Sequence, residues 1–177
     1  MNSLTASSLN VTATLGPFGL AFPAEPRAVQ RLACDEIGSR PFLTSLQAHH
    51  VSAPLGGRDV YEFRIGCGIA SSPWTNLGPH ALLWASARNG LAACPRPLSA
   101  SGLYVSRARE RTWRGGRDLY GFSLACNSEE VDALDSGDTI DERRGKRCPP
   151  GSFISAIEIS RGFEPKGAYD LYEFELE

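Results

Sequence analysis

The stretch GGRDVYEF at residues 56–63 returns as GGRDLYGF at residues 115–122 and again as GAYDLYEF at residues 167–174. A chain of 177 residues thus contains one short sequence three times. Regular recurrence of this kind indicates an architecture built from copies of one supersecondary unit.

The similarity between the copies extends well beyond these eight residues. When the copies are aligned on the repeated aspartate, the preceding segments superpose without gaps: FLTSLQAHH from Phe42, SASGLYVSR from Ser99 and FISAIEISR from Phe153. Only the middle copy has two additional residues, since Arg107 precedes Asp118 by 118 − 107 = 11 residues against 9 in the other copies. Variation in length is typical of loops, so each copy is predicted to be two regular segments joined by a turn.

Residues after each aspartate alternate between apolar and polar side chains. A period of two is that of a β-strand with one buried face, so each copy is predicted to be an amphipathic hairpin. Because a two-stranded hairpin is only marginally stable in water, the three copies are expected to pool their apolar faces around a pseudo-threefold axis. The apolar residues are Tyr61, Phe63 and Ile65; Tyr120, Phe122 and Leu124; and Tyr172, Phe174 and Leu176.

We therefore predict an all-β fold of three hairpins closed around this axis. The repeated Tyr and Phe are expected to fill its middle, and the segments between copies to add outer strands. Residues 34–177 are predicted to form this domain, with copies at about 34–67, 94–126 and 148–177, and residues 1–33 to form an N-terminal arm or outer strands.

The segment SEEVDALDSGDTIDE at residues 128–142 contains seven acidic residues and few apolar ones. That composition favours a mobile linker between the second and third copies. The basic run RRGKR that follows fits either a solvated loop or a dibasic processing sequence.

Composition excludes some classes of function. The net charge is −2, whereas phosphate backbones require a surplus of Lys and Arg, so no nucleic-acid partner is expected. No stretch reaches the roughly 18 consecutive apolar residues of a membrane span. The first residues lack the basic leader of a secretory signal, which predicts either a cytosolic protein or a mature or trimmed chain.

Four of the five cysteines occupy equivalent places. Cys67 and Cys126 each follow the buried tyrosine of their copy by six residues, and Cys34 and Cys94 lie upstream of the same hairpins. Because a hairpin brings its two ends together, we predict the disulfides Cys34–Cys67 and Cys94–Cys126. Such bonds indicate an oxidising compartment. The alternative is a cytosolic protein with five reduced, buried cysteines.

The fifth cysteine, Cys148, precedes the third copy, but its expected partner falls at position 178, one residue beyond Glu177. Either the chain is trimmed, or Cys148 is a free thiol or forms an intermolecular bridge.

The order Cys, Pro, turn, strand, loop, Asp, strand, Cys resembles the repeat of vitelline membrane outer layer protein 1. It is carried by ACPRPLSASGLYVSRARERTWRGGRDLYGFSLAC and by RCPPGSFISAIEISRGFEPKGAYDLYEFELE. The resemblance covers residues 34–177 and implies a threefold β-prism in an extracellular coat or glycan-associated protein. The chain is also similar to the C-terminal β domain of apicomplexan perforin-like proteins, which contacts membranes, and more distantly to dermatopontin.

The hairpin tips differ where the strands agree, which is the usual division between scaffold and site. Leu55, Trp113 and Phe163 fall on tips that are expected to face water. If the axis brings the tips to one end, they could form a membrane or partner contact. The alternative is that each tip folds onto its own loop.

Arginines are concentrated around Trp113. Such a surplus suits anionic lipid, sulfated glycan or an acidic protein surface, although a solvated strand face also explains such a run. The residues predicted to contact a ligand or partner are Arg107, Arg109, Arg111, Trp113, Arg114, Leu55 and Phe163.

No catalytic motif or cofactor-binding motif appears, so no enzymatic activity and no cofactor are predicted. The repeated Asp59, Asp118 and Asp170 could bind calcium, but closing a turn through backbone N–H groups is the favoured role. No metal site is predicted, because His49 and His50 face opposite ways in a strand.

The sequence predicts a secreted, cell-surface or lumenal binding module that recognises a membrane or glycan through its tips. The alternative is a structural or accessory subunit docked in a larger protein assembly. The Pro-punctuated arm TLGPFGLAFPAEP supports the alternative, since an extended apolar segment needs a surface to lie on.

Overall fold

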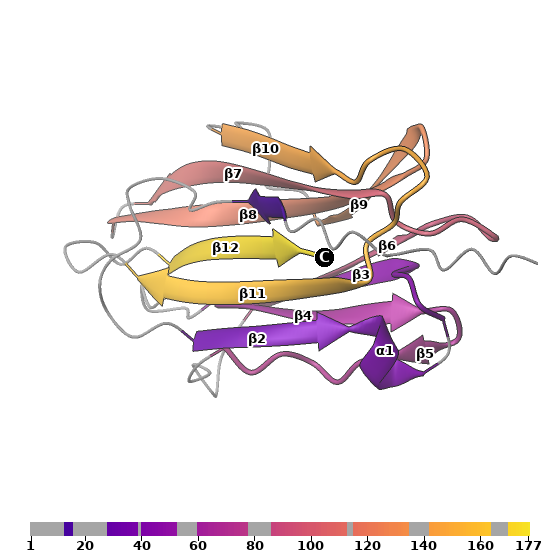
Figure 1. Cartoon of the computed structure of the whole chain (residues 1–177). Coiled ribbons are helices and arrows are strands. Elements are labelled where there is room, and N and C mark those ends of the chain that lie inside the picture. The colour runs from indigo at the N-terminus through magenta and orange to yellow at the C-terminus, as the bar shows by residue number, and fades with distance from the viewer. Residues whose placement is uncertain are drawn as a thin grey trace, which may run out of the picture.

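Each repeated segment forms an antiparallel hairpin in the computed structural model, which describes residues 13–15, 28–38, 40–52, 60–77, 86–112, 115–134, 142–163 and 170–177 (Figure 1). The three hairpins confirm the predicted all-β repeat. Their strands are β3 (Ser45–Ser52) with β4 (Val60–Cys67), β7 (Gly102–Thr112) with β8 (Gly115–Cys126), and β11 (Ala156–Phe163) with β12 (Asp170–Leu176).

Outer strands extend each hairpin to a four-stranded sheet. Sheet 1 has the order β5-β4-β3-β6, sheet 2 the order β10-β7-β8-β9 and sheet 3 the order β1-β12-β11-β2. The outer strands are β1 (Ala13–Leu15), β2 (Ala28–Ala33), β5 (Ala70–Ser71), β6 (Ser86–Ala93), β9 (Glu129–Leu134) and β10 (Glu142–Arg147).

The outer strand beside β3, β7 or β11 always leads into the cysteine of the next copy. β6 ends before Cys94 and β10 ends before Cys148. β2 ends before Cys34 and pairs with β11, so a strand near the N-terminus completes the third sheet. The three antiparallel sheets thus form a closed β-prism-like arrangement. The boundaries at residues 33 and 34 stay a prediction.

The acidic segment is not a mobile linker where the structure describes it. Residues 129–134 form β9, which pairs with β8, and residues 142–147 form β10, which pairs with β7. Composition misled here because a strand on the edge of a sheet is held by its backbone ladder and few apolar contacts. Val131 and Ala133 supply those contacts by packing against the core. Residues 135–141 lie outside the described part of the chain.

Two layers of aromatic rings fill the axis, as predicted. Tyr61, Tyr120 and Tyr172 contact one another with ring centroids 5.3 to 5.6 Å apart. The next layer holds Phe63, Phe122 and Phe174, with centroids 4.9 to 5.7 Å apart. All six rings are buried, and edge-to-face packing of this kind stabilises beyond the area buried.

The layers also fix the direction of the hairpins. In every copy the tyrosine is nearer than the phenylalanine to the hairpin turn, so equivalent layers can form only if the three hairpins run the same way. β3, β7 and β11 therefore end, and β4, β8 and β12 begin, at one end of the molecule, which we call the tip end. Figure 1 shows that the strands of the three sheets lie along roughly the same axis.

The tyrosine hydroxyls join neighbouring sheets. The Tyr61 hydroxyl oxygen accepts a hydrogen bond from the backbone N–H of Tyr120, and that of Tyr172 accepts one from the N–H of Tyr61, both at 2.8 Å. In the part of the chain that the structure describes, the outer strands β5 and β9 do not pair with Tyr61 or Tyr120. The hydroxyls therefore satisfy buried donors that would otherwise destabilise the core.

A ring of backbone hydrogen bonds closes the opposite end, the base end. The N–H of Leu43 donates to the carbonyl of Ile154 at 2.8 Å, Ile154 to Ala100 at 2.9 Å, and Ala100 to Leu43 at 2.7 Å. These three residues are buried at equivalent positions of the copies. The threefold pattern is thus kept by backbone bonds as well as by side chains.

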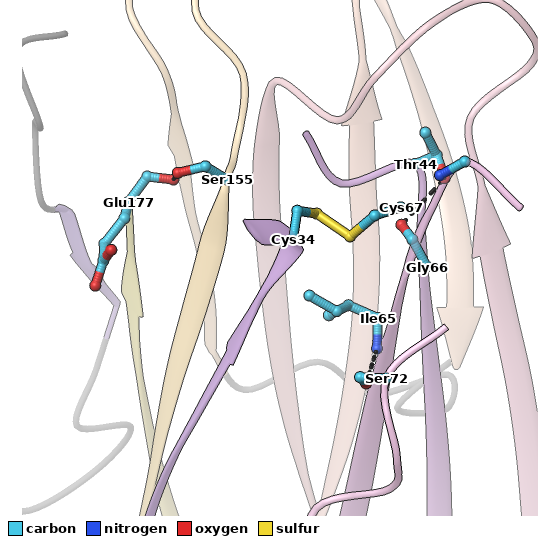
Figure 2. Close-up of a disulfide and its surroundings, with 9 residues drawn as sticks. Cys34, Thr44, Ile65, Gly66, Cys67, Ser72, Ser155 and Glu177 are labelled. Atoms are coloured by element: carbon cyan, nitrogen blue, oxygen red, sulfur yellow. Dashed lines mark hydrogen bonds between the residues drawn. A yellow bond between two sulfur atoms is a disulfide. The ribbon is translucent and has the colours of Figure 1, made fainter. Parts of the chain in front are cut away.

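Both predicted disulfides are present at the base end. Cys34–Cys67 joins sheet 3 to sheet 1 (Figure 2), and Cys94–Cys126 joins sheet 1 to sheet 2. They suggest an oxidising environment. Cys34 begins the short helix α1 (Cys34–Ile37), whose C-cap Gly38 has a φ of 85°, the left-handed conformation that glycine adopts without strain.

Candidate functional site

The structure brings the strands that carry the predicted contact residues to the tip end. Arg109 and Arg111 lie in β7, where they pair in register with Asp118 and Gly116, and Phe163 is the last residue of β11. The contact residues Leu55, Trp113 and Arg114 lie outside the described residues, as does Asp59. The tip contact therefore stays a prediction, but the described strands that lead into the three tips end on one side of the molecule.

Arg107 departs from the expectation of an exposed contact. It has the inward parity of Val105 and pairs in register with Tyr120. Its side chain is 12% exposed and reaches Glu142 of β10 at 3.4 Å. Arg107 is half-buried, and its equivalents His50 and Arg161 are buried. The alignment of Arg107 with His50 and Arg161 could have predicted this burial, because all three share an inward-facing strand position. That position determines where the side chain lies, although arginine usually faces water.

This inner polar layer is held by specific contacts. His50 stacks on the Tyr61 ring with centroids 4.5 Å apart, and the Arg161 guanidinium donates to the carbonyl of Leu77 at 2.9 Å. A buried cation with a fixed hydrogen-bond partner is part of the scaffold rather than a contact surface. Arg107 is accordingly left out of the tip surface proposed below.

At the base end the structure shows a pocket of about 420 Å³ that sequence reasoning missed. It lies where β3 begins, β4 turns into β5 and β6 ends. Its lining residues are Arg40, Thr44, Ser45, Gly68, Ile69, Ala93, Cys94, Arg96 and Leu98.

The charged residues that line this pocket, Arg40 and Arg96, are both arginines. Thr44 is already satisfied, because its hydroxyl donates to the carbonyl of Gly66 and accepts from the N–H of Gly68, both at 3.0 Å (Figure 2 shows Thr44 beside Gly66). Within the part of the chain that the structure describes, Arg40 and Arg96 pair with no acidic side chain. Among the described residues, no acidic side chain therefore neutralises the positive charge of this pocket.

Ile69 stands at the rim of this pocket and is 90% exposed. It is the second residue of a two-residue turn between paired Cys67 and Ala70, and the first, Gly68, has a φ of 77°. The matching turn of sheet 2 has Asn127, with a φ of 63°, followed by Ser128. The turn requires a positive φ at its first residue but no isoleucine at its second, so the fold does not explain Ile69.

The outer face of sheet 1 carries an aromatic cluster. The Trp74 ring lies 5.0 Å from the Arg64 guanidinium and 5.8 Å from the His49 ring. His49 Nδ1 lies 3.3 Å from Glu62, while His50 points inward, so the two histidines face opposite ways as expected. Trp74, 37% exposed, already has a cation on its ring. It therefore serves as cover for the sheet.

Two further features concern ions and membranes. No group of three or more acidic, histidine or cysteine side chains suited to a metal ion occurs among the described residues. In the same residues, no helix has the length and hydropathy of a membrane span.

Comparison with known proteins leaves the family open. No family model matches the chain, and no curated protein matches it. Among solved structures, the mosquito-larvicidal Cry4Aa toxin from Bacillus thuringiensis matches with 14% identity and a TM-score of 0.37 over 85% of this chain. The match spans only 32% of the toxin chain. A similarity at this level does not show a shared function.

Proposed function

We propose that this chain is a non-catalytic binding module that recognises an anionic membrane or glycan surface through its tip end. The single observation that carries the proposal is the register of the aromatic layers, which requires all three hairpins to end on one side. Loops that emerge together from a rigid scaffold are the common location of binding residues. The disulfides support placing the module outside the cell, on its surface or in an oxidising lumen.

The strand sequences support a division of labour between scaffold and tips. Tyr and Phe recur at equivalent strand positions and pack in the core, whereas the tip sequences VSAPLGGR, RERTWRGGR and RGFEPKGAY differ. Residues that vary while the frame stays constant are free to meet the requirements of a ligand.

The chemistry of the middle tip favours an anionic ligand. Arg109, Arg111 and Arg114 surround Trp113 in the sequence. Guanidinium groups bind phosphate and sulfate through paired donors, and an adjacent tryptophan can enter a lipid interface or stack on a sugar.

The proposal is tested by replacing Trp113 with alanine and measuring binding to phosphatidylserine-containing vesicles and to heparin. Loss of a desolvated anchor should weaken binding by about 2 kcal/mol, roughly 30-fold, and an exposed tip residue should change stability by about 0.5 kcal/mol or less. Trp74→Ala is the matched control, because that tryptophan covers sheet 1 away from the tips, and it should leave binding unchanged.

The two ligand arms separate membrane from glycan. Unchanged binding by Trp113→Ala in both arms, or unfolding of that variant, would overturn the tip proposal. If the wild-type chain binds neither probe and sediments only with other proteins, the accessory-subunit alternative is favoured instead.

A further inference from the structure

The pocket at the base end is lined by a small residue whose counterpart in sheet 2 is large. Ala93, the last residue of β6, pairs with Ser45, and the equivalent position of sheet 2 is Arg147, which pairs with Gly102. The Arg147 guanidinium donates a hydrogen bond to the carbonyl of Asn127 at 2.7 Å. Its side chain therefore covers the equivalent surface at the base of sheet 2. In sheet 1 the short side chain of Ala93 does not cover the equivalent surface, and the pocket lies there.

Its two cations are likewise not required by the fold. Cys34 to Phe42 spans 42 − 34 = 8 residues, whereas the equivalent segments Cys94–Ser99 and Cys148–Phe153 span 5. Arg40 lies in this longer segment, and Arg96 lies in the segment Cys94–Ser99, which also lines the pocket. The segment of sheet 2 that matches the one around Arg96 has CPPGS and no cation.

The donors in this pocket suit a phosphate group. A phosphate monoester carries about 1.5 to 2 negative charges at pH 7, which matches two guanidinium groups without acidic partners. The Ser45 hydroxyl also lines the pocket and hydrogen-bonds to no other described residue. A volume of about 420 Å³ lies within the usual range of small-ligand sites.

The exposed aliphatic side chain at the rim of the pocket indicates that the ligand also has an apolar part. Ile69 is almost fully in water beside these cations, and contact with an apolar group would remove that exposed surface. A ligand that joins a phosphate to an aliphatic chain would satisfy both halves of the site.

We propose that the pocket lined by Arg40, Arg96 and Ile69 binds the phosphate group of an amphiphile, with the guanidinium groups on the phosphate and Ile69 on the aliphatic part. The site lies at the opposite end of the molecule from the tips and is independent of the tip proposal. The phosphate could belong to a membrane lipid or to a free amphiphile, since the chemistry recognised is the same.

The test uses hexyl phosphate, inorganic phosphate and phosphatidylcholine vesicles with and without phosphatidic acid, with binding followed by calorimetry and by co-sedimentation. Hexyl phosphate should bind more tightly than inorganic phosphate. The double variant Arg40→Gln, Arg96→Gln should weaken binding of both by about tenfold or more. Ile69→Ser, which introduces the residue of the matching turn, should weaken hexyl phosphate by about threefold to tenfold and leave inorganic phosphate unchanged.

Matched controls separate specific contacts from net charge. Arg144→Gln, Lys146→Gln removes the same charge from exposed β10 and should bind hexyl phosphate as the wild type does. Trp113→Ala should also bind it normally, which keeps failure at the tips distinct from failure here. Binding to phosphatidic acid vesicles that depends on Ile69 assigns the phosphate to a membrane lipid, and binding of hexyl phosphate alone assigns it to a free amphiphile.

Three outcomes overturn the proposal. They are no binding of hexyl phosphate or vesicles, equal loss in the β10 control, and binding that survives Arg40→Gln, Arg96→Gln in a protein whose thermal unfolding is unchanged.

Discussion

The boundary between sheets 1 and 2 and the boundary between sheets 2 and 3 use the same backbone frame in different ways. At the first, Cys94–Cys126 joins the sheets and β6 lies beside β9. At the second, Cys148 has no disulfide and β1 lies beside β10. The backbone is equivalent nonetheless: the N–H of Cys148 donates to the carbonyl of Ser101 at 2.8 Å, as that of Cys94 donates to Thr44 at 2.9 Å.

The side chains of the adjoining outer strands differ as well. Ala92 of β6 is buried opposite Leu46, whereas the equivalent Lys146 of β10 is exposed. One boundary is therefore apolar and covalently closed, and the other is cationic and held by hydrogen bonds and core packing. The aromatic layers and the backbone ring are thus common to both boundaries and define the fold, while the disulfides reinforce it.

If the aromatic layers define the fold, the largest loss of stability should come from a change in this core, which all the sheet boundaries share. Phe122→Ala removes a fully buried ring that packs against Phe63 and Phe174. The cavity should lower the free energy of unfolding by about 3 to 5 kcal/mol, measured by denaturant titration. A loss smaller than that caused by removing a disulfide would contradict this view of the core.

Removing the disulfide between sheets 1 and 2 should lower the free energy of unfolding by nearly as much. The pair Cys94→Ala, Cys126→Ala removes a cross-link between residues 32 apart in sequence, which should lower stability by about 3 to 4 kcal/mol through the entropy of the unfolded chain. Cys148→Ala is the matched control and should change stability by about 1 kcal/mol or less, since no cross-link is lost. Equal losses in the two proteins would show that packing of sulfur, rather than the bond, matters.

A new disulfide between sheets 2 and 3 should raise the free energy of unfolding. The carbonyl of Glu177 accepts from the N–H of Ser155, as that of Gly66 accepts from Thr44, so a cysteine appended after Glu177 should face Cys148 as Cys67 faces Cys34. The resulting disulfide should add about 3 kcal/mol, and the same extension in Cys148→Ala should add nothing. Burial raises the pKa of the Cys148 thiol. Because the thiolate is the reactive form, closure should therefore accelerate as pH rises.

The cationic boundary also contains a position that tolerates only glycine. A Cβ on Gly145 would lie 1.9 Å from the Tyr104 ring. That ring is flanked by Arg143 and Arg147, whose guanidinium carbons lie 5.0 and 5.6 Å from its centroid. Gly145→Ala should displace the ring and lower stability by about 1 to 3 kcal/mol. The same change made in Tyr104→Ala should cost much less, and a double-mutant cycle measures the difference.

Structural features that depend on local sequence could be predicted, whereas features that depend on contacts in the folded chain could not. Period-two alternation is local, so the hairpins and the buried Tyr61 and Phe63 followed from it, and the disulfides followed from hairpin closure. Outer strands between the copies were expected, but β9 and β10 were not placed, because the acidic composition of residues 128–142 favoured a linker and edge strands need little hydrophobicity. Arg107 was misplaced because its inward parity weighed less than its charge. The Arg40–Arg96 pocket could not be predicted, since it depends on segments that meet only in the folded chain.

The smallest effect concerns an ion pair close to the unlinked end of β12. Arg31 of β2 donates to both carboxylate oxygens of Glu177, at 3.1 and 2.7 Å. The hydrogen bond from Arg31 lowers the pKa of Glu177 below its ordinary value. A carboxylate with a lowered pKa stabilises the fold above the pKa of the unfolded state, and that contribution is lost as pH falls through the lower pKa of the folded state.

Because the two side chains are 36% and 27% exposed, solvent and salt screen the pair, and its contribution should be only about 0.5 kcal/mol. We therefore expect Glu177→Gln to be less stable than the wild type by that amount near neutral pH. The two unfolding free energies should converge as the solution is acidified below the ordinary pKa of a glutamate, and added salt should narrow the gap at neutral pH. A difference that persists in acid would mean that the Glu177 side chain stabilises this end of sheet 3 through hydrogen bonds that do not depend on its charge, beside the backbone bonds of Ser155 and Ala156.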